Sequence, residues 1–347
     1  MYGYRAGLPA PMIRVFPQPT CNLETDMRIR AFLKLGLAVL ALSATLAGCG
    51  GDDDDDHDLP AAPQANIAQV AQQQGFNALL AAVTKAGIGG TLADANAQLT
   101  VFAPTDAAFN DLARRLGFAD ATAMVNALPA PALQSILTYH VLGTKKLAAD
   151  LSAGGATQNT AYTYAGAPAR LNFDFTGGVR ITDAALTTAN VTTANVAASN
   201  GVIHVVDKVL VPPGVLNIVQ MAQANPNFSS LVNAVVASNL QATLGGAGPF
   251  TVFAPTNAAF AAAPQNLTAA QLRTVLTYHV VNGQVLSSQI PFGTPVATVA
   301  GQNIVISAGT PPTIRDSTAV AARISAVDVR ASNGVIHVVD KVLIPTL

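Results

Sequence analysis

Histidine is the residue type whose chemistry can be followed most directly here, because the chain has only five and four of them recur in pairs. His140 and His279 each follow a tyrosine, whereas His204 and His337 each lie in an Ile-His-Val-Val-Asp run. An imidazole can ligate a metal, transfer a proton or hold a buried hydrogen bond. A metal site needs several His, Cys or carboxylate ligands together, and no clustered acids lie near these pairs. We therefore expect no metal site at the paired histidines.

Catalytic signatures are absent from the sequence. No Gly-rich phosphate loop follows a predicted strand, and no Gly-x-Ser-x-Gly elbow occurs. From Cys49 onward the chain has no glutamate, 17 Asp and 13 Lys+Arg. Six of these Asp lie in residues 52–58, so the remainder carries a net charge of +2 (13 minus 11). This weak charge is not typical of nucleic-acid binding. We predict a protein that is not an enzyme, needs no cofactor and presents polar, weakly charged surfaces.

The segments that carry the histidines occur twice. Three blocks return in the same order, namely Thr100–Thr105 as Thr251–Thr256, Leu137–Val141 as Leu276–Val280, and Ala198–Leu210 as Ala331–Leu343. The last block is identical letter for letter. Ordered blocks over more than 130 residues indicate two tandem duplicated domains rather than a short-period solenoid.

Local signals predict the structure of these blocks. Asn200-Gly201 predicts a hairpin turn in which both residues have positive φ, and the alternating β-branched residues after it predict a strand. Thr105 and Thr256 follow predicted strands and precede helical patterns, so each is expected to cap the N-terminus of a helix.

Together the three blocks resemble the signature of the fasciclin domain family. The Thr-Val-Phe-Ala-Pro-Thr box, the Asn-Gly-x-Ile-His-x-Val-Asp-x-Val-Leu box and the Tyr-His pair between them are present in both copies, over residues 64–347. The resemblance implies an α+β fold of two tandem fasciclin domains, 64–212 and 213–347. Each would be a β-rich wedge or half-barrel capped by short helices. It also implies adhesion or binding outside the cytoplasm, without catalysis.

The resemblance also suggests binding residues. In some animal members the Tyr-His pair is implicated in integrin-dependent adhesion, which makes Tyr139-His140 and Tyr278-His279 candidates. The alternative is a buried pair whose hydrogen bonds lock a helix against the sheet. An adhesion motif of some members, Asp-Ile, corresponds to Asp328-Val329 in the second copy but to Asn195-Val196 in the first.

The other signature positions are interpreted as structural. They are a threonine, a histidine and an aspartate in each copy: Thr105, His204, Asp207, Thr256, His337 and Asp340.

The N-terminal region predicts export. Residues 27–48 combine basic residues with an apolar run that is too short to span a membrane. Leu46-Ala-Gly-Cys49 resembles the lipobox of bacterial lipoproteins, which implies acylation of Cys49, and the alternative is a secreted protein cut near Ala47. Residues 1–26 are interpreted as a gene-start artefact, with a genuine long leader as the alternative.

Residues 49–63 are predicted to be an acidic tether. The run Asp52–Asp56 with Asp58 repels itself and favours an extended spacer, although such a run could also hold a divalent cation loosely. By resemblance, Gly50 after the cysteine favours delivery to the outer membrane. The sequence leaves open whether the domains face the periplasm or the cell surface.

Two functions remain open. The first is a lipid-anchored cell-envelope protein that binds a cell-surface or matrix protein or a polysaccharide. Nucleic acid is not expected as a partner. The alternative is a periplasmic protein that binds a small molecule, saccharide or lipid in a groove between helices and sheet.

Overall fold

The computed structural model describes residues 64–347. The predicted export signal, Cys49 and the acidic tether lie outside the described residues. Among the described residues no helix is long and apolar enough to cross a membrane. We refer to residues 64–212 as the first repeat and to residues 213–347 as the second repeat.

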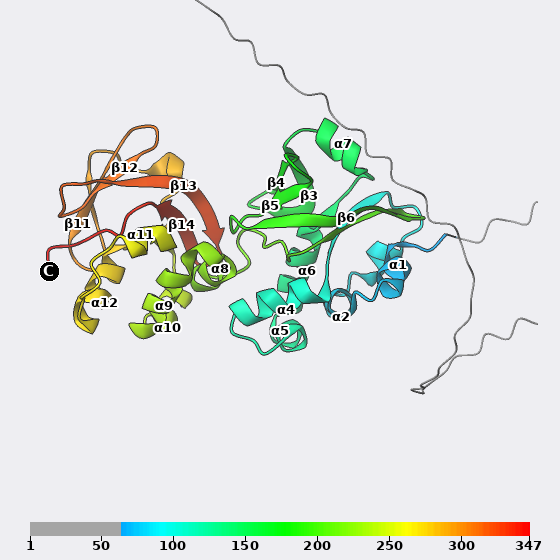
Figure 1. Ribbon diagram of the computed structural model, residues 1–347, viewed down its shortest axis with the longest axis horizontal. Coiled ribbons are helices and arrows are strands. Elements are labelled where there is room, and N and C mark those ends of the chain that lie inside the picture. The colour runs from blue at the N-terminus through cyan, green and yellow to red at the C-terminus, as the bar shows by residue number, and fades with distance from the viewer. Residues whose placement is uncertain (1–63) are drawn as a thin grey trace, which may run out of the picture. The chain divides into compact units, whose positions relative to one another are not determined.

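The two repeats contain nearly the same elements in the same order (Figure 1). The first repeat consists of α1 (Ile67–Gln73), α2 (Asn77–Ala86), α3 (Gly89–Ala93), β1 (Leu99–Pro104), α4 (Asp106–Arg115), α5 (Ala121–Ala127), α6 (Ala130–Tyr139), β2 (Val141–Leu142), α7 (Ala148–Ala153), β3 (Thr157–Tyr164), β4 (Ala167–Asp174), β5 (Arg180–Thr182), β6 (Thr188–Ala198) and β7 (Gly201–Val206).

The second repeat consists of α8 (Ile218–Ala224), the 3-10 helix η1 (Pro226–Phe228), α9 (Ser229–Ala237), α10 (Gln241–Gly245), β8 (Phe250–Pro255), α11 (Asn257–Ala261), α12 (Ala269–Tyr278), β9 (Val280–Asn282), the 3-10 helix η2 (Ser287–Gln289), β10 (Pro295–Ala297), β11 (Asn303–Ser307), β12 (Thr313–Arg315), β13 (Ala322–Ala331) and β14 (Gly334–Val339). Between its first two signature blocks this repeat has no helix equivalent to α5, which accounts for its shorter spacing there.

Each repeat is built around a seven-stranded sheet. The order in the first repeat is β2-β1-β7-β6-β5-β4-β3, and in the second it is β10-β11-β12-β13-β14-β8-β9. The two signature boxes lie side by side inside each sheet, because β1 pairs in parallel with β7 and β8 pairs in parallel with β14. The predicted strand of the second box is thus bonded on both sides, to a hairpin partner and to a strand from about 100 residues earlier.

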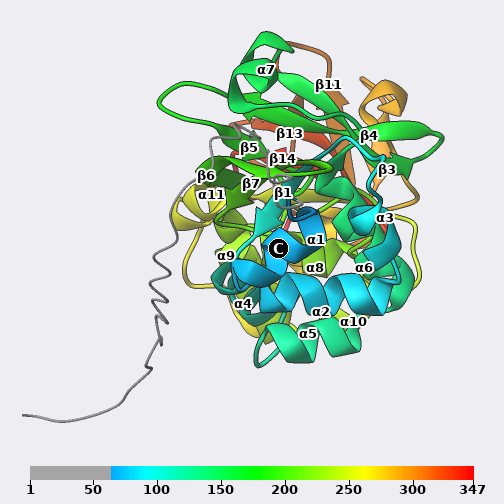
Figure 2. The same ribbon diagram turned by 90° about the vertical axis from the view of Figure 1, so that its right-hand side faces the viewer.

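Both faces of the interior strand β7 are buried because two cores flank it. In Figures 1 and 2, α1, α2, α4 and α5 lie on one side of the first repeat's sheet and α7 lies on the other. The core on the helical side includes Leu79, Val83, Leu137, Ile203 and Val205. The core enclosed by the curled sheet includes Phe102, Leu171, Ile181 and Val206. The sheet therefore forms a half-barrel with helices packed against one face.

The predicted Asn-Gly turn is wrong in detail. The β6–β7 loop is Ser199-Asn200, Gly201 already pairs with Ala198 at the start of β7, and Asn200 is not among the described residues with positive φ. Asn200 is instead a buried bridge. Its Oδ1 accepts a hydrogen bond of 2.9 Å from the N–H of Ile67, and its Nδ2 donates to the carbonyls of Leu92 and Asp94.

The same bridge occurs in the second repeat, where Asn333 contacts Ile218, Leu244 and Gly246. Asparagine is thus required at this position for contacts that tie the first helix and the α3 or α10 region to the sheet. A local turn rule cannot anticipate these partners, because they lie far away in the sequence.

Candidate functional site

The first Tyr-His pair lies in the interior, at the C-terminal end of α6. The hydroxyl of Tyr139 donates to the carbonyl of Arg170 on β4 at 2.9 Å. The Nε2 of His140 accepts a hydrogen bond of 2.8 Å from the N–H of Leu210, so its Nδ1 carries the proton and donates to the carbonyl of Ile136 at 2.7 Å. The pair therefore connects α6 to the sheet and to the segment after β7.

The second pair makes the same contacts at the end of α12. Tyr278 donates to the carbonyl of Asn303 at 2.9 Å. His279 accepts from the N–H of Leu343 at 2.9 Å and donates to the carbonyl of Val275 at 2.8 Å. Tyr139, His140, Tyr278 and His279 are each at most 2% exposed. None of the four side chains is available on the surface of the described chain.

Burial keeps these histidines neutral at physiological pH. It lowers the pKa of His140 and of His279 to about 4, while the hydrogen bond to a helix carbonyl acts weakly in the opposite direction. Burial, with the nearby negative charge of Asp183, also raises the pKa of Tyr139. The pairs act as fixed hydrogen-bonding groups in this environment.

Replacing Tyr139 by phenylalanine is expected to lower the free energy of unfolding of the first repeat by about 1 kcal/mol, because the Arg170 carbonyl loses its hydroxyl partner. Urea unfolding would measure the change. Tyr164→Phe is the matched control, since the Tyr164 hydroxyl makes no hydrogen bond within residues 64–347 and little change is expected. Equal effects of both variants would contradict the anchoring role of Tyr139.

The second-box histidines bridge two segments from within the sheet. His204 accepts from the N–H of Asn195 at 3.3 Å and donates through Nε2 to the carbonyl of Lys146 at 3.0 Å. His337 repeats this with Asp328 and Val285, at 3.4 and 2.9 Å. Burial lowers the pKa of both histidines. Each histidine connects the register irregularity of the neighbouring strand, β6 or β13, to the chain segment after β2 or β9.

Asp328 lies at an irregularity of β13 with φ of 60°, and the equivalent Asn195 on β6 has φ of 61°. The Asp328 carboxylate accepts from the N–H and hydroxyl of Ser287 at 2.9 and 2.6 Å. Asn195 accepts from the N–H of Ala148 at 2.9 Å. The amide in the first repeat therefore makes a hydrogen bond equivalent to that of the acid in the second. Val329 is buried, whereas Asp328 is partly exposed.

Thr105 and Thr256 occupy the N-caps of α4 and α11. The Thr105 hydroxyl accepts from the N–H of Ala108 at 3.2 Å, and that of Thr256 accepts from Ala259 at 3.3 Å. Such a bond satisfies one of the free N–H groups at a helix start.

Asp207 and Asp340 follow the last strand of each repeat. Asp207 accepts from the backbone and side-chain nitrogens of Asn190, both at 2.7 Å, and Asp340 accepts from the N–H of Arg323 at 2.7 Å. Both aspartates connect the chain end to the neighbouring strand, β6 or β13.

A second pair of aspartates, Asp183 and Asp316, was not predicted from the sequence. Asp183 is buried and accepts hydrogen bonds of 2.8–3.0 Å from Ala185, Thr187 and Val211, with no cation beside it among the described residues. Burial raises its pKa to about 6, and the hydrogen bonds only partly offset this. Asp183 and Asp316 are 133 residues apart, which is also the spacing of the two copies of the second box. This spacing was the signal in the sequence that could have identified the pair.

Asp316 differs because Lys341 pairs with it at 2.6 Å. Burial opposes its ionisation, but hydrogen bonds from Lys341, Thr318 and Ile344 outweigh burial and lower its pKa. The equivalent lysine of the first repeat, Lys208, has no ion pair within residues 64–347.

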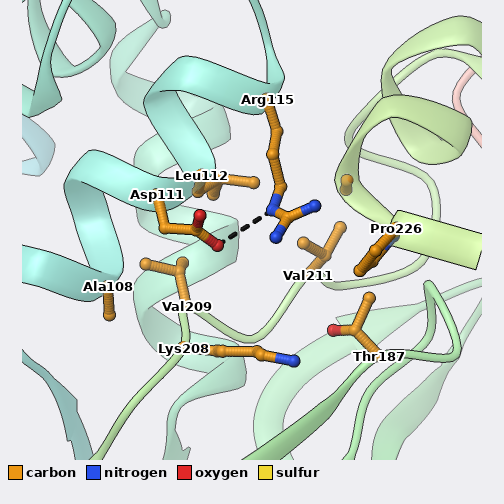
Figure 3. Close-up of a pocket in the computed structure, with 10 residues that line it drawn as sticks. Ala108, Asp111, Leu112, Arg115, Thr187, Lys208, Val209, Val211 and Pro226 are labelled. Atoms are coloured by element: carbon orange, nitrogen blue, oxygen red, sulfur yellow. Dashed lines mark hydrogen bonds and ion pairs between the residues drawn. The ribbon is translucent and has the colours of Figure 1, made fainter. Parts of the chain in front are cut away.

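Lys208 instead lines a small pocket where the first repeat meets the start of the second. Figure 3 shows the Asp111–Arg115 ion pair of 2.8 Å across from Lys208, with Val211 and Pro226 beside it. The pocket volume is about 20 Å³, which is close to the space of one water molecule. The pocket is too small for an organic ligand.

A much larger polar groove lies on the first repeat. Its volume is about 650 Å³, and its lining includes Lys146 and Arg170. The groove was not predicted from the sequence, because these residues come from segments with no shared motif. Among the described residues, no group of three or more His, Cys, Asp or Glu could hold a metal ion.

Comparison with known proteins agrees with this architecture. The model of the Fasciclin domain matches residues 74–212 and 226–345, and the chain belongs to the fasciclin domain family. Protein sll1483 of Synechocystis sp. is 40% identical over 142 residues, which are 38% of this chain and 75% of that protein. The predicted fold of two tandem fasciclin domains with sheets capped by short helices is confirmed.

Two further relatives are more distant. Human periostin is 34% identical over 155 residues, which are 43% of this chain but only 18% of periostin. A solved FAS1 domain pair from the insect cell adhesion molecule fasciclin I covers 80% of this chain and 98% of its own, with 18% identity and a TM-score of 0.40.

Proposed function

We propose that this chain is a lipid-anchored adhesion or matrix-binding protein of the cell envelope that acts through two fasciclin domains without catalysis. The observation that carries the proposal is that both halves of the described chain are fasciclin domains. Fasciclin domains occur in adhesion proteins, which supports a non-catalytic, adhesion-type role.

Contacts of residues 211–214, where the first repeat continues into the second, and of Asn225 support joint action of the two repeats. The N–H of Gly214 donates to the carbonyl of Arg330 at 2.9 Å, and the side chain of Asn225 donates to the carbonyl of Ala185 at 2.8 Å. Tyr162 donates to the carbonyl of Pro213 at 3.1 Å. Two linked weak contacts bind more strongly than one, because the second becomes intramolecular.

The proposed role of the Tyr-His pairs is support of the fold rather than direct contact with a partner. Their polar atoms are engaged in buried hydrogen bonds. Partner contacts would then come from exposed polar side chains. Asp328 stays a candidate because it is partly exposed, whereas Val329 would support it from the interior.

The alternative, a small-molecule binding protein, would need a cavity between helices and sheet. The apolar cavities at this place measure about 30 Å³ in each repeat. Pockets for drug-sized ligands are about 300–1,000 Å³. This difference favours the adhesion proposal.

Protease shaving of intact cells, followed by mass spectrometry, tests the proposal. We expect release of peptides from residues 59–347 and an acylated N-terminal peptide at Cys49. The Cys49→Ser variant is the control, and it is expected to leave the membrane fraction. Protection of all these peptides until the outer membrane is opened would contradict the adhesion proposal and favour a periplasmic role.

A further inference from the structure

The polar groove of the first repeat lies between β2, the segment after it, and the edge strand β3. Its volume of about 650 Å³ falls within the usual range of ligand sites, about 300–1,000 Å³. No acidic residue lines it. The lining includes residues with hydroxyl, amide and cationic side chains: Thr144, Lys146, Thr157, Gln158, Asn159 and Arg170.

Signature residues hold the backbone of both cations. The carbonyl of Arg170 accepts the hydrogen bond of the Tyr139 hydroxyl, and the carbonyl of Lys146 accepts that of His204. The N–H of Lys146 donates to the Thr100 hydroxyl at 2.8 Å. The buried Tyr139 and His204 thus fix the backbone from which the two charged side chains of the groove extend.

The side chains keep hydrogen-bonding capacity for a ligand. Lys146 donates to the Gln158 side-chain oxygen at 2.7 Å, and the Gln158 nitrogen is fixed by the carbonyls of Gly154 and Gly155. An ammonium has three donors, so two remain. Arg170 is exposed, and its guanidinium makes no hydrogen bond or ion pair with any residue that the structure describes.

The second repeat has the same supports without the charges. Tyr278 and His337 hold the carbonyls of Asn303 and Val285, which replace Arg170 and Lys146. The chain around Val299 also covers the outer edge of β9, because the N–H of Val299 donates to the carbonyl of Val280 at 2.8 Å. The fold therefore does not need the two cations, and they are a particular feature of the first repeat.

We propose that this groove binds an acidic polysaccharide whose carboxylates pair with Lys146 and Arg170. The guanidinium of Arg170 can bind a carboxylate through two parallel hydrogen bonds. Hydroxyl and amide groups outnumber the cations, which matches a uronic acid polymer, where hydroxyls outnumber charges. A polyphosphate would call for more cations, and an acidic peptide offers few hydroxyls. The inference rests on the proposed function and names its partner class.

Isothermal titration of the full-length chain in a non-ionic detergent with hexagalacturonate tests this assignment. We expect one site per chain, and about tenfold weaker binding for both Lys146→Gln and Arg170→Gln, because each removes a charge-assisted hydrogen bond. Lys145→Gln is the matched control, since this neighbouring exposed lysine does not line the groove. Its affinity should stay within about twofold of the unchanged chain.

Maltohexaose and hexa-aspartate separate the alternatives as probes. Binding of maltohexaose as tight as that of hexagalacturonate, or tighter binding of hexa-aspartate, would overturn the assignment. So would no binding of hexagalacturonate, unchanged affinity of the Lys146 and Arg170 variants, or an equal loss in Lys145→Gln. Adherence of beads coated with the chain is measured in parallel. Adherence without uronate binding would reject only the ligand class, whereas absence of adherence to all surfaces would reject the proposed function.

Discussion

Replacing Gly201 by alanine is expected to lower the free energy of unfolding of the first repeat by about 3 kcal/mol or more, because the new methyl group overfills a packed core. An added Cβ would overlap the carbonyl oxygen of Leu99 on β1 and approach the Ile67 side chain to 2.9 Å. The β1–β7 pair, which joins the two signature boxes, would have to separate. Urea unfolding measures the change.

Gly90→Ala is the control in the same repeat. Its Cβ would meet nothing within 4 Å, and it lies in the helix α3. Alanine is favoured over glycine in helices by about 1 kcal/mol, so this variant should be neutral or slightly stabilised. Gly334→Ala should reproduce the loss in the second repeat, since its Cβ would overlap the carbonyl of Phe250. If Gly201→Ala unfolds like Gly90→Ala, the close approach does not limit this position.

Acidification from pH 7 to pH 5 is expected to destabilise the second repeat by about 2 kcal/mol, and the first repeat by clearly less. His279 has a folded pKa of about 4 against an ordinary value of 6.5. The unfolded chain binds a proton between these values and the folded chain does not. The stability that the neutral His279 contributes is therefore complete above pH 6.5 and is lost as the pH falls toward 4.

In the first repeat the lowered pKa of His140 causes the same loss of stability on acidification, but the raised pKa of Asp183 opposes it. The folded pKa of Asp183, about 6, lies above its ordinary value of 3.8. Folding therefore favours the protonated carboxyl, and the first repeat regains about 1 kcal/mol between pH 6 and pH 5. Asp316 has a lowered pKa and offers no such compensation. Its protonation destabilises the second repeat further when the pH falls below the ordinary aspartate pKa of 3.8.

Urea titrations read by hydrogen-exchange mass spectrometry would resolve the two repeats at pH 7 and pH 5. Asp183→Asn is the matched control, because it removes the compensating carboxyl. The pH-dependent loss in its first repeat should rise to that of the second. Equal losses in the two repeats of the unchanged chain, or no effect of Asp183→Asn on the difference between pH 7 and pH 5, would refute this assignment.

The sequence by itself determined the family, the duplication and the two-domain α+β architecture. These properties appear as ordered, repeated blocks, and blocks such as Thr100–Thr105 specify strand, cap and helix through neighbouring residues. Threonine caps can be inferred in this way because the partner N–H lies three residues away. Local patterns are sufficient wherever the contacts are local.

Only the tertiary structure decided the roles of Asn200, Asp183 and the groove residues. Asn200 contacts Ile67 and Leu92 across more than 100 residues, and the turn pattern of Asn-Gly suggested a different explanation for its presence. Lys146 and Arg170 come together because His204 and Tyr139 each hold one of them by a backbone carbonyl. A backbone carbonyl is present at every residue, so such contacts leave no trace in side-chain identity and could not be predicted from the sequence.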